Sequence, residues 1–117
     1  MNKQLLNASG LLSGFSYPQS FLRVVQLNLV EIEPWYIMNS KELEVRVQGM
    51  KERYPERILI PFARRCDNDD VACFELDKDE EVQIIHDFAS VGYEQRNVYK
   101  TFWDWFRSAV EDMIQFD

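Results

Sequence analysis

The sequence predicts a single domain in which helices pack on a β-sheet. Two patterns support this: strand-like apolar runs in the middle of the chain are joined by short connections, and an amphipathic segment follows them. With 117 residues, 46% hydrophobic and 14% aromatic, the chain has the size of one domain and can bury roughly two-thirds of its unfolded surface. We find no repeat, low-complexity tract or linker, so the domain is expected to span residues 1–117.

A first helix is expected from about Gln19 to Leu27, in the segment YPQSFLRVVQL. Pro18 would lie just inside a helix start that follows Ser16, where its missing N–H group has no cost. The inward stripe is expected to comprise Phe21, Leu22, Val25 and Leu29. The next segment, PWYIM, is aromatic and aliphatic between Pro34 and Asn39, which is typical of a short strand.

The segment after PWYIM fits two structures. Asn39, followed by Glu42, is a capping-box pattern that starts a helix, and one helical face would carry Leu43, Val47, Met50 and Tyr54. The residues from Leu43 to Val47 also alternate as in a strand. An ion pair between Glu42 and Arg46 and a stop at Pro55 favour the helix. The choice between helix and strand stays open.

Three strands are expected next, joined by connections short enough for hairpins. The first, RILIPFA, is apolar at successive positions, as in a strand covered on both sides, and Pro61 indicates that part of one edge is unpaired. The second and third, DDVACFEL and EVQIIHDF, alternate more weakly. The connections RRCDND and DKDE place acidic residues at turns.

The segment TFWDWFRSAVEDMIQF predicts an amphipathic helix that packs on the sheet. Its apolar stripe is expected to contain Phe102, Phe106, Ala109 and Met113, flanked by Trp103, Trp105, Val110 and Phe116. An aromatic stripe at helical spacing packs in a core far more often than it binds a ligand. We therefore assign it to packing.

The net charge of −7 is concentrated in one segment. From Asp67 to Glu81 there are eight acidic residues and one basic residue, and the rest of the chain is balanced. Such a segment repels phosphate backbones, so nucleic-acid binding is not expected. A basic protein is the natural partner; the alternative is a solvated loop without a partner.

The stretch RRCDNDDVACFE contains the residue types of a metal or redox site, but no pattern is complete. Aligned on Asp67, a calcium loop would need oxygen ligands and a glycine where Val71 and Ala72 stand. A zinc site needs about four Cys or His ligands, and the whole chain offers only Cys66, Cys73 and His86. We expect no metal, no cofactor and two free thiols, with Cys73 in the core and Cys66 in a loop.

Catalysis is not expected either. The single histidine, His86, has no serine or cysteine in a recognisable nucleophile motif, and Asp87 beside it would point to the opposite face of a strand. Paired carboxylates for acid–base catalysis need one in an apolar pocket that raises its pKa; the loop acids are expected to be in water, and Glu33, beside Pro34 and Trp35, is the one carboxylate with apolar neighbours. The sequence therefore predicts no catalytic residue, and a binding protein rather than an enzyme.

The stretch from Gln4 to Leu22 carries no charged residue. Polar residues and Pro18 interrupt it, so it lacks the continuous run of about 20 apolar residues that spans a membrane. It also lacks the cleavage pattern of a secretory signal. We expect a cytoplasmic protein without membrane contact.

Several segments together resemble the SUKH superfamily, the bacterial immunity proteins related to the fungal cell-wall-synthesis regulators. They are YPQSFL, the pair Pro34–Trp35, LIPFA, an acidic turn with Asn68–Asp69, VQIIHDF and TFWDWF. The resemblance covers the chain from about Ser16 onward. It implies an α+β fold in which helices pack on a mostly antiparallel, curved sheet. It also implies a non-enzymatic protein that binds and neutralises a toxin domain, often a nuclease.

Charge and resemblance together predict an immunity protein whose partner is a basic toxin domain. The expected contact residues are Glu33, Trp35, Asp67, Asp69, Asp70, Asp77, Glu80 and Glu81. The alternative is an intracellular regulatory or scaffold module with a host protein partner. The oligomeric state, the binding face and the arrangement of the N-terminal region are left open.

Overall fold

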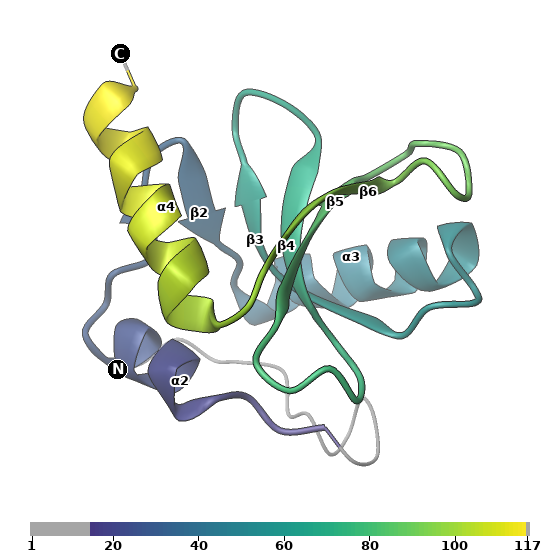
Figure 1. Ribbon diagram of the computed structural model, residues 1–117, viewed down its shortest axis with the longest axis horizontal. Coiled ribbons are helices and arrows are strands. Elements are labelled where there is room, and N and C mark those ends of the chain that lie inside the picture. Colours follow the sequence, from purple (N-terminus) through teal and green to yellow (C-terminus); the bar gives the residue numbers. More distant parts are fainter. Residues whose placement is uncertain (1–14, 117) are drawn as a thin grey trace.

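The computed structural model describes residues 15–116, in which three helices pack on a sheet of six strands. Its helices are α2 (Gln19–Gln26), α3 (Ser40–Arg53) and α4 (Phe102–Gln115). Its strands are β1 (Glu31–Ile32), β2 (Trp35–Ile37), β3 (Leu59–Arg65), β4 (Asp70–Glu75), β5 (Val82–His86) and β6 (Gln95–Tyr99). Neighbouring strands pair in chain order from β1 to β6, always antiparallel (Figure 1). The predicted fold class is confirmed.

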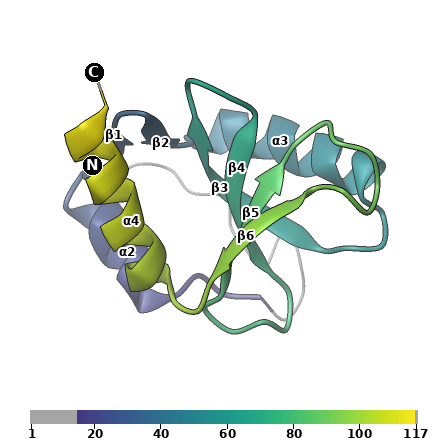
Figure 2. The same ribbon diagram turned by 45° about the horizontal axis from the view of Figure 1, so that its top comes forward.

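Helices cover the sheet on both faces (Figure 2). Residues at alternate positions, such as Phe62, Phe74 and Ile84, share a core cluster with residues of α2 and α4. The positions between them, such as Cys73 and Ile85, share a second cluster with residues of α3. This arrangement explains why RILIPFA is apolar throughout, as predicted for a strand covered on both sides.

The edge beside Pro61 is open, also as predicted. Strand β2 pairs only with Ala63–Arg65 of β3, so it does not reach Pro61. On the other side, Pro61 lies opposite Cys73, and the β3–β4 register shifts between Pro61 and Ala63. A bulge at this point suits a residue that has no N–H group to donate.

The first helix starts at Gln19, as predicted, and ends at Gln26, one residue before the expected end, but its buried face differs from the prediction. Pro18 occupies the N-cap position without a side-chain cap, so it lies just before the helix rather than just inside it. Its buried side chains are Phe21, Val24 and Val25. Leu29 has the spacing of this face, four positions after Val25, but the helix ends at Gln26. Leu29 therefore lies outside the helix and is 41% exposed.

Helix α3 settles the ambiguous segment, because the capping box is complete. The Asn39 side chain accepts a hydrogen bond from the Glu42 N–H at 2.9 Å, and the Glu42 carboxylate accepts one from the Asn39 N–H at 3.0 Å. The predicted Glu42–Arg46 ion pair is wrong. Glu42 lies 3.5 Å from Arg64, and Arg46 donates to Asp87 at 2.8 Å, because the helix turns both side chains toward the sheet.

Helix α4 packs through Phe102, Trp105 and Ala109, so its buried face is rotated from the predicted stripe. Phe106 is half-buried, and Met113 is 39% exposed. The rotation follows from the aromatic core, since the Trp105 ring lies 5.0 Å from that of Phe62. The C-terminal end of α4 extends away from the sheet (Figure 1).

Two strands and two strand ends were not predicted correctly, since β3 also continues past the expected end at Ala63 to Arg65. Strands β1 and β6 were missed: β1 has two residues, and β6, QRNVY, is an edge strand with four exposed residues and one half-buried residue. A strand that buries neither face carries no alternating apolar pattern. The predicted strand EVQIIHDF ends at His86, and Asp87 and Phe88 begin a loop.

The prediction about the uncharged stretch from Gln4 falls mostly on residues 4–14, outside the described part of the chain. Within residues 15–116, no helix has both the length and the apolar character needed to cross a membrane.

Candidate protein-interaction site

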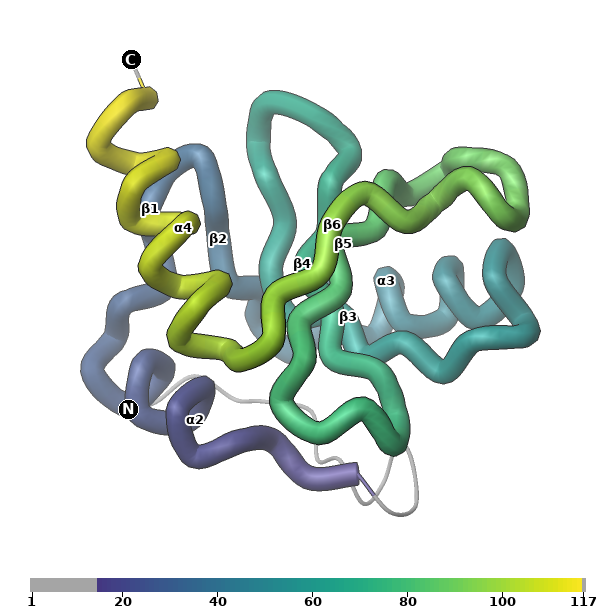
Figure 3. Tube along the Cα trace, viewed as in Figure 1, coloured from purple at the N-terminus to yellow at the C-terminus, as the bar shows by residue number. Residues whose placement is uncertain are grey.

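The acidic segment does not form one patch. Strand β4 separates its two turns, residues 66–69 between β3 and β4 and residues 76–81 between β4 and β5, which lie at opposite ends of the sheet (Figure 3). Six residues of β4 correspond to about 20 Å at roughly 3.4 Å per residue. The predicted contact residues Asp67, Asp69 and Asp70 are therefore brought together at one end, and Asp77, Glu80 and Glu81 at the other.

Basic neighbours neutralise most of the acids at the β3–β4 end. Arg65 donates to Asp67 at 2.8 Å, and this hydrogen bond holds the pKa of Asp67 below its usual value. Asp70 contacts Arg96 and His86, each at 3.1 Å. Asp69 is exposed and has no ion-pair partner within residues 15–116. Little unbalanced charge remains at this end.

The β4–β5 turn has the unbalanced charge. Residues 77–81 contain four acids and Lys78, and none of the four acids is in an ion pair with another described residue. Asp77 and Asp79 have left-handed backbone angles, with φ of 66° and 51°, which aspartate tolerates better than most residues. Asp77, Asp79 and Glu80 are exposed, whereas Glu81 is half-buried and accepts a hydrogen bond from the Gln83 side chain at 3.1 Å.

Trp35 and Glu33 have different environments. Trp35 is 3% exposed, its indole N–H donates to Asp112 at 3.1 Å, and its ring packs edge-on against Trp105 at 5.4 Å. Because the ring belongs to the core, it offers almost no surface to a partner, and we leave Trp35 out of the proposed interface. Glu33 is exposed in the short turn between β1 and β2.

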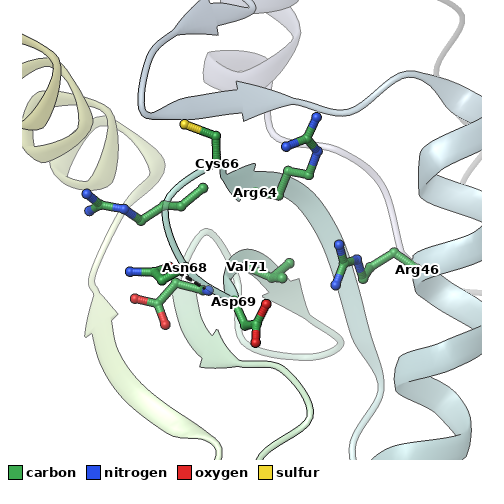
Figure 4. A pocket seen from close by; sticks show the side chains of 8 residues that line it. Arg46, Arg64, Cys66, Asn68, Asp69 and Val71 are labelled. Atoms are coloured by element: carbon green, nitrogen blue, oxygen red, sulfur yellow. Dashed lines mark hydrogen bonds between the residues drawn. The ribbon is translucent and has the colours of Figure 1, made fainter. Parts of the chain in front are cut away.

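A polar hollow of about 360 Å³ lies between the β3–β4 end and α3. Figure 4 shows Arg46, Arg64, Cys66 and Asp69 around it. Its three arginines are all engaged: Arg46 with Asp87 at 2.8 Å, Arg64 with Glu42 at 3.5 Å and Arg65 with Asp67 at 2.8 Å. With its cations paired and Asp69 among its walls, the hollow is not suited to bind an anion.

A second hollow, of about 310 Å³, lies between α4 and the sheet. It is lined by aromatic and polar side chains, among them Trp35, Arg65, Arg96, Tyr99, Trp105, Ser108 and Asp112. The Trp105 indole N–H has no hydrogen-bond partner within residues 15–116. Arg65 donates to Asp112 at 3.3 Å, and the hydroxyl groups of Tyr99 and Ser108 are 3.0 Å apart. These contacts join α4 to the sheet, and none pairs a nucleophile with a base.

Within residues 15–116, no three His, Cys, Asp or Glu side chains are grouped so that they could hold a metal ion. His86 lies 3.1 Å from Asp70 and 3.4 Å from Arg96. Both partners of the histidine are thus charged surface residues rather than a nucleophile. This arrangement suits a structural contact at the end of β5.

The two cysteines are free, as predicted. Cys73 is fully buried, its sulfur lies 3.9 Å from that of Met50, and burial raises the pKa of its thiol. Cys66 is exposed. A thiol reacts as the thiolate and must be accessible, so the two should differ strongly in reactivity.

We expect Ellman's reagent to label one thiol per native chain and two in denaturant, and a Cys66→Ser variant to remove the native signal. Rapid labelling of two thiols in the native wild-type protein would contradict the burial of Cys73 in the core. So would a native disulfide between the two, which non-reducing electrophoresis and mass spectrometry would detect.

The sequence reading missed the loop between β5 and β6, residues 87–94. It exposes the large apolar side chains of Phe88, Val91 and Tyr93, and it begins with Asp87, which is fully buried. The available signal was the position of three large apolar residues in a segment that lacks both helical and strand periodicity.

A scan against models of protein families, a search of curated proteins and a search of solved structures each gave no match.

Proposed function

We propose that this chain is an immunity protein that binds and neutralises a basic toxin domain in the cytoplasm, without catalysis of its own. The observation that carries the proposal is the β4–β5 turn, whose exposed carboxylates at Asp77, Asp79 and Glu80 are not ion-paired with described residues. The resemblance to the SUKH superfamily supplies the class of partner.

An acidic turn with unbalanced charge suits capture of a basic protein. Its acids have no ion-pair partner among residues 15–116, so its field acts on an approaching partner and raises the association rate. The same field repels nucleic acid. Blocking a toxin requires tight binding and no bond-making step, which fits a surface without a nucleophile–base pair among the described residues.

Co-expression tests the function directly. We expect the gene beside that of this chain to encode a polymorphic toxin, and the probe is the C-terminal domain of that toxin, expressed in bacteria with and without the chain. We expect growth rescue and a one-to-one complex on co-purification. If the chain neither rescues growth nor binds that domain, the proposal fails. Tight binding to a host protein instead would support the regulatory alternative.

Neutralising the acidic turn should slow the association. Asp77→Asn, Asp79→Asn and Glu80→Gln remove three charges, and asparagine keeps the left-handed backbone at the first two positions. We expect the association rate at low salt to fall by about tenfold, since steering contributes a factor of 10 to 1,000. The gap should close at about 0.5 M salt, where exposed charges are screened. Stopped-flow or surface plasmon resonance measures the association rate of the variant and of the wild type at each salt concentration.

The matched control removes three exposed charges from the α3 side of the molecule, through Glu44→Gln, Glu52→Gln and Glu56→Gln. It changes the net charge equally, so an equal fall in rate would show a general charge effect. We avoid substituting Asp70, because its contacts with Arg96 and His86 would be lost together with its charge.

A further inference from the structure

The loop of residues 87–94 presents an unusual apolar surface. Phe88 is 63% exposed, Val91 64% and Tyr93 81%, all within six residues. Single exposed apolar side chains are normal on a protein surface, but a group of them at one place indicates an interaction site. The loop projects from the sheet above α3 (Figures 1 and 2).

The start of this loop is fixed to α3 by a buried carboxylate. The Asp87 side chain has no exposure and accepts hydrogen bonds from Arg46 at 2.8 Å and from Arg53 at 2.7 Å. Burial raises the pKa of Asp87, but the hydrogen bonds from Arg53 and Arg46 outweigh burial and lower it overall. The Tyr54 hydroxyl donates to the Ala89 carbonyl at 2.8 Å.

The end of the loop is fixed as well. The Glu94 carboxylate accepts from Arg57 at 2.9 Å and from the Gly92 N–H at 2.7 Å. The His86 N–H donates to the Glu94 carbonyl at 2.7 Å, and the Tyr93 N–H donates to the Ser90 carbonyl at 2.9 Å. Hydrogen bonds therefore hold both ends and the middle of the loop.

Phe88 lies in the left-handed backbone region, with φ of 72°, where bulky residues are rare and which costs energy. The Asp87 carboxylate accepts from the Phe88 N–H at 2.9 Å. The Arg53 guanidinium carbon lies 4.1 Å from the centre of the Phe88 ring. Asp87 and Arg53 thus hold the ring in place, although it remains largely exposed.

We propose that Phe88, Val91 and Tyr93 form the apolar anchor that seats in a pocket of the toxin domain, an inference that rests on the proposed function. A loop that is already ordered loses little entropy on binding, and buried aromatic anchors carry most of the energy of an interface. Its structure therefore suits tight binding, whereas the acidic turn at the other end of β4 acts on the rate of encounter.

Charge at the loop indicates the surroundings of that pocket. The buried Asp87 and Glu94 are balanced by Arg46, Arg53 and Arg57. Asp69 lies next to the loop, since its carbonyl accepts from the Asp87 N–H at 3.0 Å, and its carboxylate is exposed. The fitting pocket is apolar at its centre and basic on the side that meets Asp69.

A membrane surface is a poorer fit than a protein. Loops and helices that bind anionic lipids combine apolar side chains with lysine or arginine. Residues 87–94 contain no basic residue and two acidic ones. Membrane binding and pairing with a second copy of the chain are therefore treated as outcomes that would overturn the proposal.

The test is a double variant, Val91→Ser with Tyr93→Ser, which removes two anchors and leaves the hydrogen-bonded side chains of the loop intact. The matched control is Leu27→Ser with Ile114→Ser. Leu27 lies just after α2 and is 55% exposed, and Ile114 lies on α4 and is 67% exposed. Affinity and dissociation rate are measured against the toxin domain used in the co-expression test, with a thermal melt for each variant.

We expect the loop variant to bind at least about 100-fold more weakly, mainly through faster dissociation, as for loss of interface hot spots. Its melting temperature should match the wild type, and the control should bind normally. Normal binding by the loop variant, or equal loss in the control, overturns the anchor while the immunity function stands. Failure of the wild type to bind overturns the function itself.

Light scattering and vesicle sedimentation complete the test. If the loop variant binds the toxin normally but turns a wild-type dimer into a monomer, the occupant of the loop is a second copy. If it loses sedimentation with vesicles of phosphatidylcholine and phosphatidylserine instead, the occupant is a membrane. Either result contradicts the proposal.

Discussion

Replacing Asp87 by asparagine is expected to lower the free energy of unfolding by about 3 kcal/mol, the lower end of the range for breaking a buried ion pair. The lower end applies because its partners Arg46 and Arg53 are 24% and 28% exposed, so water can solvate them after the loss. Urea unfolding at pH 7, followed by fluorescence, measures the change.

The effect should depend on pH with a definite sign. The pKa of Asp87 is lowered in the folded chain, so its contribution is complete above the unfolded value of about 3.9 and is lost as pH falls through the folded value. The difference between wild type and the Asp87→Asn variant should therefore be constant near neutrality and shrink below about pH 4.

An exposed pair provides the control for this prediction. Asp104 and Arg107 are 3.5 Å apart and both largely exposed, so Asp104→Asn should change stability by less than about 1 kcal/mol. If Asp87→Asn lowered the free energy of unfolding no more than Asp104→Asn, the loop would not depend on its buried carboxylate. The proposal that the loop is ordered before it binds would then be contradicted.

Replacing Phe62 by alanine should cost about 4 kcal/mol, within the range of roughly 3 to 5 for buried aromatic residues. Phe62 has no exposure, stacks on Phe74 at 4.6 Å and meets Trp105 edge-on at 5.0 Å. Its removal leaves a cavity where β3 meets β4 and α4. A domain at the low end of the usual range of about 5 to 15 kcal/mol would then keep only about 1 kcal/mol of stability.

A milder substitution keeps that prediction measurable. Phe62→Leu should lose less stability because leucine refills part of the space, and Ile114→Ala should change it by less than about 0.5 kcal/mol, since Ile114 is 67% exposed and surface changes are small. Equal losses at Phe62 and Ile114 would contradict the position of Phe62 at the centre of the core.

The sequence predicted the parts of the fold that rest on local rules. The capping box at Asn39 and Glu42 marks the start of α3 because both of its hydrogen bonds are local. The run RILIPFA indicates burial on both faces because a strand with one face in water carries polar residues at alternate positions, and this run is apolar at successive positions. Helix α4 follows from its amphipathic pattern, but its rotation does not, since the choice between Trp105 and Phe106 is made by Phe62 on a distant strand.

The binding surfaces were harder to predict, because they depend on which residues meet across the sheet. The acids of residues 67–81 are continuous in sequence, yet β4 carries them to opposite ends, and Arg57 and Arg96 neutralise members of the group. Tryptophan is a residue type enriched in protein interfaces, but Trp35 is buried in the core. Asp87 has two arginine partners from α3 that no local pattern connects to it.

The packing of α2 against α4 has a consequence for biosynthesis. The Phe21 ring of α2 lies 5.7 Å from the Phe102 ring of α4, whereas each strand of the sheet pairs with its neighbour in the chain. On a ribosome the hairpins can therefore form as they emerge, since local contacts form early. Helix α2 can cover only its own part of the aromatic face, so the part that α4 covers stays exposed until α4 has been translated. Nascent chains in that interval are the species that chaperones are expected to engage.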